Sequence, residues 1–199
     1  MLLISYFEPF GRDPLNSTEV ICEEIKRVRR DVQFVKLPTV FYESGTVLTS
    51  LIKEVNPDTV IMLGQAGGRA AITPEMVALN WIDARIKDNR GQKPIDKKIV
   101  EGGPAAYFST LPVRKIVEAL TKGGIPARVS YSAGTFVCNA LFYQVMHFII
   151  ENRYQIKAGF VHFPYLSGQV LYREEAPSLD LAKSIEGLNL IIELMEGSL

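Results

Sequence analysis

Residues 59–63 form a continuous apolar run, Thr-Val-Ile-Met-Leu, that ends at Gly64. A strand without polar alternation is typical of the centre of a sheet whose two faces are both covered by helices. Such sheets are mostly parallel, and their strands are joined by helical crossovers. This run therefore predicts a chain in which strands and helices alternate.

The rest of the sequence has this alternation. Apolar runs, and alternation over residues 32–37, predict five strands, over residues 2–7, 32–37, 59–63, 125–131 and 158–163. Helical spacing predicts five helices: one capped by Ser17 or Thr18, one over 43–55, one from Ser109 or Thr110 to Leu120, one beginning at Cys138, and one over 178–194. The pattern predicts the α/β class, as one three-layer α/β/α domain over residues 1–199 with a mostly parallel, twisted central sheet.

The composition limits the partners of the chain. Among 199 residues, Lys plus Arg and Asp plus Glu both number 22, so no overall field attracts nucleic acid or an anionic membrane. Small neutral substrates or protein partners are favoured. No apolar run approaches the ~20 residues of a membrane span, and no signal peptide or disulfide framework is recognisable, so we expect a soluble, cytoplasmic protein.

Cys138 lies where small residues give way to a strongly apolar helical run. A thiol at a helix N-terminus is close to free backbone N–H groups and to the positive end of the helix dipole, which favour the thiolate. This position suggests a nucleophile. The alternative is a small buried hydrophobic residue, as most free cysteines are.

A nucleophilic cysteine needs a base, and the chain has two histidines. His147 is nine residues after Cys138 on the same predicted helix, which places it about half a turn round the helix axis. His162 instead ends the last strand, next to the Cys138 helix in a crossover that brings strand ends together. His162 is therefore the candidate base, with a structural role as the alternative. Glu75 follows a glycine loop on the same side of the sheet and could orient the imidazole, unless it is an ordinary exposed glutamate.

Several loops follow the carboxyl ends of predicted strands, where parallel sheets bind ligands. Phe7 and Phe10 flank the turn after the first strand. They could line an apolar pocket, or they could be aromatic residues of the core. Residues 64–69 contain three glycines, a pattern that allows close backbone approach but matches no nucleotide fingerprint. The polar stretch 87–104 predicts a long surface excursion, either a flap or an oligomer contact.

Taken together, these segments resemble the pyrrolidone carboxyl peptidases (pyroglutamyl peptidase I), cysteine peptidases that remove an N-terminal pyroglutamate. The resemblance spans nearly the whole chain. It rests on five motifs: Phe7-Glu8-Pro9-Phe10-Gly11; Ala66-Gly67-Gly68-Arg69 through Ile72-Thr73-Pro74-Glu75 to Ala78-x-Asn80; Ile82-Asp83-Ala84-Arg85-Ile86; Tyr107-Phe108-Ser109-Thr110-Leu111-Pro112; and Ser130-x-Ser132-Ala133-Gly134-x-Phe136-x-Cys138-Asn139.

The resemblance implies a role for each candidate residue. Cys138 would be the nucleophile, His162 the general base and acid, and Glu75 the group that orients the imidazole. Arg85 would be an oxyanion donor, together with the backbone N–H of Cys138. Pyroglutamate would lie between Phe7 and Phe10, with polar contacts from Asn16 and Gln65. No metal or organic cofactor is implied, and the family resemblance suggests a homotetramer.

The chain departs from the family pattern at Ser5-Tyr6, where Thr-Gly is usual, at Arg12, where a glycine is usual, and at Met76, where a basic residue is usual. Two other functions are compatible with a three-layer α/β domain, because fold alone does not fix function. One is a nucleoside-phosphorylase-like enzyme that uses residues 64–69 for phosphate or a base, and the other is a catalytically silent binding protein.

Overall fold

The computed structural model describes residues 1–11, 13–171 and 175–198. A five-stranded sheet lies at the centre, in the order β2-β1-β3-β7-β4. Its strands are β1 (Leu2–Phe7), β2 (Gln33–Leu37), β3 (Thr59–Gln65), β4 (Thr73–Pro74) and β7 (Lys157–Phe163). The first four in the spatial order run parallel, and the short β4 pairs antiparallel with β7. The predicted α/β class with a mostly parallel sheet is confirmed.

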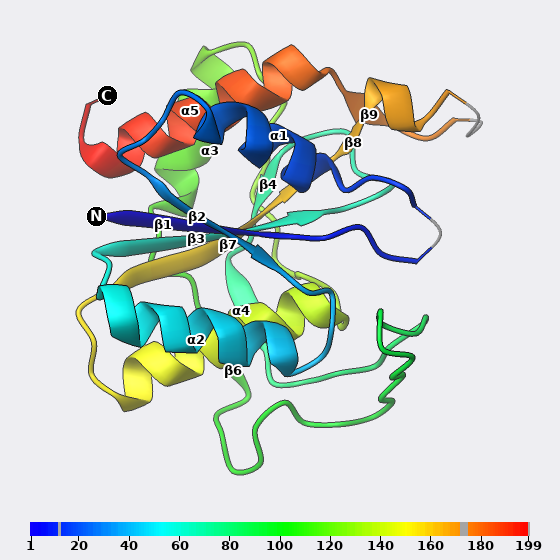
Figure 1. Cartoon of the computed structure of the whole chain (residues 1–199), viewed down its shortest axis with the longest axis vertical. Helices are drawn as coiled ribbons and strands as arrows, with labels where there is room; N and C mark the ends of the chain where they lie inside the picture. Colours follow the sequence, from blue (N-terminus) through cyan, green and yellow to red (C-terminus); the bar gives the residue numbers. More distant parts are fainter. Residues whose placement is uncertain (12, 172–174, 199) are drawn as a thin grey trace.

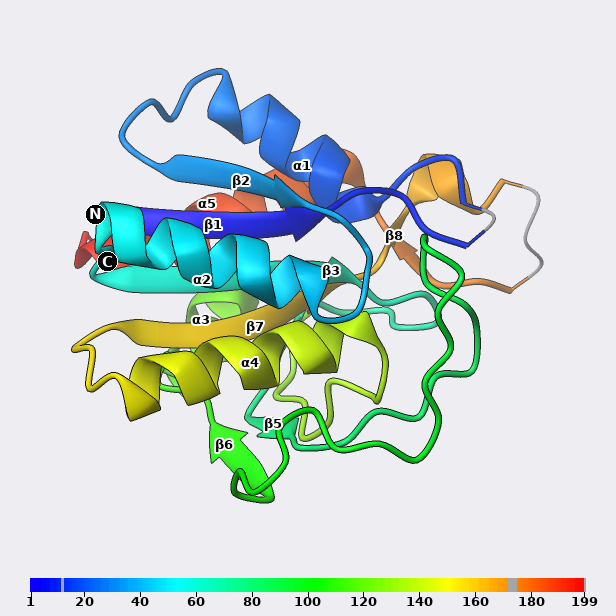
Figure 2. The same ribbon diagram turned by 60° about the horizontal axis from the view of Figure 1, so that its bottom comes forward.

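Helices cover both faces of the sheet (Figure 1). On one face lie α2 (Glu43–Val55) and α4 (Val137–Glu151), and on the other lie α1 (Ser17–Lys26), α3 (Val113–Lys122) and α5 (Leu181–Glu196). Figure 2 shows the two helical layers on either side of the strands. Successive strand residues point to opposite faces, so Val60 and Met62 pack with α2 and α4, whereas Ile61 and Leu63 pack with the other layer. The centre of the sheet is thus buried on both faces, as the apolar run predicted. No helix in the described part of the chain is long and apolar enough to cross a bilayer.

Four element boundaries differ from the sequence-based prediction. The cap of α1 is Asn16, not Ser17 or Thr18, because its side-chain oxygen accepts the N–H of Thr18. Helix α3 begins at Val113 after Pro112, not at Ser109 or Thr110. Helix α4 begins one residue before Cys138, and α5 begins at Leu181, where the Asp180 side chain caps it.

The predicted strand over residues 125–131 is wrong. This segment makes two isolated parallel bridges, Ala127 with Ile72 and Ser130 with Glu75, and no continuous ladder. Pro126 has no N–H to donate, and the segment lies at an edge of the sheet, where Ile125 is its one buried residue. Its bridge to Glu75 nevertheless supports a residue of the candidate site.

Short elements that the sequence pattern did not reveal complete the fold. These are β5 (Val77–Leu79), β6 (Ala106–Phe108), β8 (Tyr165–Leu166), β9 (Ser178–Leu179) and the 3-10 helix η1 (Ser167–Gln169). Strands β5 and β6 form an antiparallel pair, and β8 and β9 a parallel pair. Two or three residues give too little periodicity for detection.

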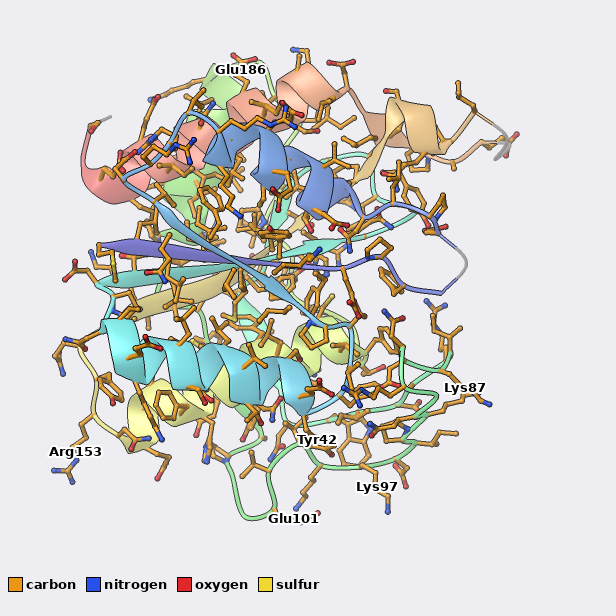
Figure 3. The ribbon with its side chains drawn as sticks, viewed as in Figure 1. Tyr42, Lys87, Lys97, Glu101, Arg153 and Glu186 are labelled. Carbon is orange, nitrogen blue, oxygen red and sulfur yellow. The ribbon has the colours of Figure 1, made fainter. Side chains whose placement is uncertain are left out.

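Residues 80–105 connect β5 to β6 without a helix or strand. This connection, called the excursion below, includes the long surface segment predicted over residues 87–104. Lys87 and Lys97 lie on its outer side (Figure 3). The main chain of the excursion is held by side chains. Asn80 accepts the backbone N–H groups of Ile99 and Val100, both at 2.9 Å, and donates to the Val100 carbonyl at 2.8 Å.

Three more side chains attach the excursion to the body of the protein. The buried Asp88 carboxylate accepts the backbone N–H of Phe41 at 3.0 Å. Asn89 donates to the Glu8 carboxylate and to the Pro9 carbonyl, both at 2.8 Å. Asn139, on α4, donates to the carbonyls of Leu79 and Trp81. The excursion is therefore fixed to the loop after β1, to the start of α2 and to α4.

Candidate active site

A cavity of about 750 Å³ lies at the carboxyl edge of the parallel strands. Its wall combines the ends of β3 and β7, the start of α4 and parts of the excursion. The lining residues are Phe10, Gln65, Ala66, Gly67, Arg69, Asp83, Arg85, Ile86, Ser132, Ala133, Gly134, Thr135, Phe136, Cys138, His162 and Tyr165. Cys138 and His162 thus lie on one cavity, at the sheet edge where parallel α/β proteins bind ligands.

His162 and Glu75 are hydrogen-bonded, with 2.7 Å between His162 Nδ1 and Glu75 Oε1. Glu75 is fully buried and His162 nearly so. A carboxylate can only accept this bond, so Nδ1 carries the proton, and the neutral imidazole has its lone pair on Nε2. The pair therefore presents a base in a defined tautomer.

The sheet register brings this pair together. Strand β4 runs antiparallel to β7, so that Thr73 lies opposite His162 and Pro74 opposite Val161. The backbone N–H of Glu75 then donates to the Phe160 carbonyl at 2.8 Å, and its bridge to Ser130 holds the other side. Glu75 is therefore fixed by backbone pairing on both sides.

Cys138 is the second residue of α4 and is half-buried. Gly64 on β3 leaves the space that the thiol fills, since a Cβ at residue 64 would lie 3.0 Å from the sulfur and 2.8 Å from the Phe160 ring. Two bonds join the loop before α4 to the excursion, from the Asp83 N–H to the Thr135 carbonyl and from the Thr135 hydroxyl to the Asp83 carbonyl. The thiol is thus fixed between β3 and the excursion.

The thiolate expected at this helix start is not favoured in the free protein. Burial raises the pKa of the Cys138 thiol to about 12, and the negative charge of Glu75 adds to this rise, while Arg69 opposes it. Burial and the carboxylate therefore outweigh the helix N-terminus. At neutral pH Cys138 is a thiol, and it becomes a nucleophile only when a base takes its proton.

Burial also lowers the pKa of the His162 imidazole below its ordinary value of 6.5, against the hydrogen bond and charge of Glu75, which raise it. His162 is therefore neutral at pH 7. Although burial works to raise the pKa of Glu75, its hydrogen bonds with His162 and Arg69 hold that pKa below its ordinary value. The resting site contains a thiol, a neutral imidazole and a carboxylate.

We expect alkylation of Cys138 by iodoacetamide to be slow at pH 7 and to accelerate about tenfold per pH unit up to pH 9, without a plateau. The thiolate fraction at pH 7 is on the order of 10⁻⁵ for a pKa near 12, against a few per cent for a free thiol. Mass spectrometry of the Cys138 peptide measures the rate. The alkylation rate of the fully buried Cys22, measured in the same samples, is the internal reference. A rate that is already pH-independent near neutrality would contradict this protonation state.

An aromatic group forms one wall of the cavity. The Phe10 and Phe136 rings are 6.1 Å apart, and Phe41 packs edge-on against Phe136 at 5.2 Å. Phe10 and Phe136 line the cavity, whereas Phe7 is buried in the core on the α2 side of the sheet. A flat apolar group in the cavity would thus meet Phe10 and Phe136.

A family model for pyroglutamyl peptidases, Peptidase_C15, matches residues 1–197. The chain belongs to the pyroglutamyl peptidase family. It is therefore a peptidase of the thiol class, and the resemblance found in the sequence motifs is confirmed.

Curated relatives and solved structures agree with this membership. Pyrrolidone-carboxylate peptidase 1 of Caldanaerobacter subterraneus subsp. tengcongensis is 44% identical over 196 residues, covering 98% of this chain and 97% of that protein. The Bacillus licheniformis pyrrolidone-carboxylate peptidase is 47% identical over 195 residues, covering 95% and 89%. The crystal structure of Bacillus amyloliquefaciens pyroglutamyl peptidase I has a TM-score of 0.91 at 44% identity, covering 96% and 93%. A mutant pyrrolidone carboxyl peptidase from Pyrococcus furiosus has a TM-score of 0.92 at 38% identity, covering 100% and 99%.

In this member of the pyroglutamyl peptidase family, Gln65 connects several elements at the cavity. Its Oε1 accepts the backbone N–H of Ser17 at 2.7 Å and the Gln169 amide at 2.9 Å, and its Nε2 donates to Asp13 at 3.2 Å. Asn16 is fully buried as the cap of α1 and is not among the described lining residues. Asn16 therefore orders the helix whose first N–H holds Gln65.

Arg85 lies on the cavity wall and is exposed, and among the described residues it has no hydrogen bond or ion pair. Its guanidinium is thus available to a ligand. His147, by contrast, contacts the Tyr107 hydroxyl at 2.8 Å from Nδ1 and lines a separate hollow between α2 and α4. The two histidines occupy different places, as their spacing from Cys138 predicted.

The departures from the family pattern have different surroundings. Tyr6 points away from the cavity into the α1 side of the core, where its hydroxyl donates to Glu23. Ser5 is fully buried on β1, and its hydroxyl has no partner in the part of the chain that the structure describes. Met76 follows Glu75, and its backbone N–H donates to the Ser130 carbonyl. Arg12 lies outside the described residues.

Among the lining residues that sequence reasoning did not single out are Arg69, Phe136 and Tyr165. Arg69 and Phe136 occur in the family motifs, but neither residue by itself suggests a contact with Glu75 or with Phe10. Tyr165 follows β7, and its ring lies over Gly67, where a Cβ would come within 2.4 Å of the hydroxyl. In the sequence, the glycine at residue 67 is the one indication of this contact. A glycine there is compatible with a close approach by another group, but it does not identify Tyr165 as that group.

Proposed function

We propose that the chain, as one catalytic domain over residues 1–199, removes N-terminal pyroglutamate from peptides by thioester catalysis. Cys138 is the nucleophile, His162 the general base and acid, and Glu75 the residue that orients the imidazole. The observation that supports this most is the Glu75–His162 hydrogen bond, because its histidine lines the same cavity as Cys138. The relatives are named as pyrrolidone-carboxylate peptidases, which agrees with this substrate.

The reaction begins with a neutral thiol and a neutral imidazole. His162 Nε2 takes the thiol proton while the sulfur attacks the carbonyl carbon that joins the pyroglutamyl ring to the next residue. Glu75 stabilises the imidazolium that forms, through the bond at Nδ1. When the C–N bond breaks, the proton passes from Nε2 to the leaving amine and a pyroglutamyl thioester remains on Cys138.

Hydrolysis of the thioester reverses these roles. His162 Nε2 removes a proton from water as the oxygen attacks the thioester carbonyl, and it returns the proton to the departing sulfur. Pyroglutamic acid leaves and the thiol is restored. Charge forms on the carbonyl oxygen in both steps, and it requires hydrogen-bond donors. The Cys138 backbone N–H, near the start of α4, and the Arg85 guanidinium are the proposed donors, supported by the lining position of Arg85.

The proposed lactam site lies between the aromatic wall and Gln65. Phe10, backed by Phe136, contacts the apolar edge of the ring, and Gln65 is the polar group at the end of β3. Phe7 supports this wall from the core rather than by direct contact. Asn16 acts through α1, whose first N–H holds the Gln65 amide.

Turnover of a chromogenic pyroglutamyl amide tests the proposed function. Release of the chromophore at rates typical of peptidases, with the acyl group trapped on Cys138, supports it. Binding of the amide without turnover would identify a catalytically silent protein. Activity that requires phosphate and survives thiol alkylation would indicate the phosphorylase-like alternative, which the family membership disfavours.

A prolyl amide is expected to react on the order of 10³-fold more slowly than the pyroglutamyl amide, as kcat/KM. Proline has the same five-membered ring, but it lacks the lactam carbonyl and carries a charged amine. Burying that amine without a partner costs several kcal/mol. Side-by-side kinetics measure the ratio, and equal turnover of the two amides would contradict the substrate assignment.

The companion variant Phe10→Ala should raise KM and lower kcat/KM while the chemical step persists, because it removes positioning and no proton-transfer group. Phe108→Ala is a matched control, since Phe108 is exposed on β6 and does not line the cavity. Unchanged KM in Phe10→Ala would place the lactam elsewhere in the cavity.

Two further properties are proposed with the activity. We infer a cytoplasmic location, supported by two cysteines that both remain free thiols, as a reducing compartment favours. A homotetramer is suggested by the family resemblance, and sedimentation velocity of the purified protein measures its mass.

A further inference from the structure

Arg69 has contacts that the proposed mechanism does not use. It follows the turn at Gly67 and Gly68, where Gly68 has a φ of +86°. Its Nη1 donates to the Thr73 hydroxyl and to Glu75 Oε1, the latter at 2.6 Å, and its Nη2 donates to the Ser132 carbonyl at 3.0 Å. One guanidinium therefore joins β4, Glu75 and the loop before α4.

The contact with Glu75 involves the same oxygen that binds the histidine. Oε1 accepts both His162 Nδ1, at 2.7 Å, and Arg69 Nη1, at 2.6 Å. Oε2 is buried and has no hydrogen-bond partner among the described residues. A fully buried carboxylate needs a counter-charge, and with His162 neutral the guanidinium supplies it. Arg69 therefore allows Glu75 to remain ionised while His162 remains an uncharged base.

The contact with Ser132 reaches the nucleophile. Ser132 begins the loop 132–136, which lines the cavity and leads directly into α4 and Cys138. The Nη2 bond ties this loop to the residue that holds Glu75. A planar, forked guanidinium can make both bonds at once, whereas an ammonium is a single point charge.

We infer that Arg69 is a positioning residue that holds Glu75, His162 and the loop before Cys138 in one geometry and that tunes the base. This inference rests on the proposed function, in which Cys138, His162 and Glu75 form the catalytic triad. Arg69 itself forms and breaks no bond in the reaction.

Electrostatics support the tuning. The charged groups that act on His162 are Glu75 and Arg69, and the Cys138 thiol lines the same cavity. Burial lowers the pKa of His162, the hydrogen bond and negative charge of Glu75 raise it, and the positive charge of Arg69 lowers it further. Removing the charge of Arg69 leaves the carboxylate without its cation, so the imidazolium becomes more favourable and the pKa of His162 rises.

The test compares Arg69→Gln, which removes the charge, with Arg69→Lys, which keeps the charge but not the fork. Arg114→Gln is the matched control, because Arg114 is exposed on α3 and has no bond in the described structure. For each protein, kcat and KM for a pyroglutamyl amide are measured between pH 4.5 and 8.5, with a thermal unfolding curve.

We expect Arg69→Gln to lower kcat about 100-fold with unchanged KM, and to move the acid limb of kcat/KM to higher pH. Arg69→Lys should lower kcat less and keep the wild-type acid limb. Wild-type kcat and pH profile in Arg69→Gln would overturn the inference. So would equal losses of kcat in both variants with neither acid limb moved, because that pattern indicates loss of packing alone.

If Arg69→Gln does not fold, Arg69→Lys decides. Reduced kcat with unchanged KM and a wild-type thermal unfolding curve supports the inference, and wild-type kcat overturns it. An inactive wild-type protein would instead overturn the proposed function, so the two failures are distinguishable.

Discussion

Cys138→Ser is expected to lower kcat/KM for a pyroglutamyl amide by about 10⁴-fold or more, the scale on which removal of a nucleophile acts in hydrolases. The serine hydroxyl is a far weaker nucleophile than sulfur, and the neighbouring imidazole of His162 is a base of limited strength. The replacement is nearly isosteric in the space that Gly64 leaves, so the folded structure should persist. Steady-state kinetics and circular dichroism measure the two effects.

Cys22→Ala is the control for this substitution. Cys22 is completely buried on α1, in the core on the other face of the sheet from α4. Its removal should cost about 1 kcal/mol of unfolding free energy and leave kcat/KM unchanged. Substantial activity in Cys138→Ser, or equal losses in the two variants, would contradict the assignment of the nucleophile.

His162→Ala should reduce kcat by about 10⁴-fold, because burial raises the pKa of the Cys138 thiol to about 12 and the variant lacks the imidazole that lines the same cavity. His147→Ala should leave kcat near the wild-type value. His147 lies on α4 against Tyr107 and borders a different hollow, so its loss affects packing between α2 and α4. The two variants therefore compare the same chemical change at two places.

The kcat of both variants is measured between pH 4.5 and 8.5, and thermal unfolding confirms that each variant is folded. Comparable losses of activity in two folded variants would refute the role of His162. Retained activity in His162→Ala would mean that the thiol loses its proton by another route.

The sequence predicted the layers better than the edges. A continuous apolar run such as residues 59–63 is typical of a strand that is covered on both faces, so the centre of the sheet could be predicted from this run and from the spacing of the helices. The strand predicted over 125–131 failed because pairing at the edge depends on Pro126 and on a two-residue partner, β4, that carries no periodic signal. Local propensity does not encode such long-range pairing.

The candidate site shows the same division. Cys138, His162 and Glu75 were found as individual residues, and the register that joins Glu75 to His162 comes from the antiparallel β4, which the sequence did not predict. The charge state of Cys138 was misjudged because the helix start is local, whereas burial and Glu75 are tertiary. Arg69 escaped notice for the same reason, since its partners are defined only in space.

The attachment of the excursion bears on how this chain can diverge. Asn80, Asp88 and Asn139 bind main-chain N–H and carbonyl groups, which almost every amino acid provides. These three side chains therefore place little constraint on the identity of the residues between them. An exposed residue such as Ile95 can be replaced by another amino acid without moving the segment. Because the same segment carries Arg85 and Ile86 to the cavity wall, descendants of this chain can acquire new preferences for peptides while inheriting an unchanged sheet.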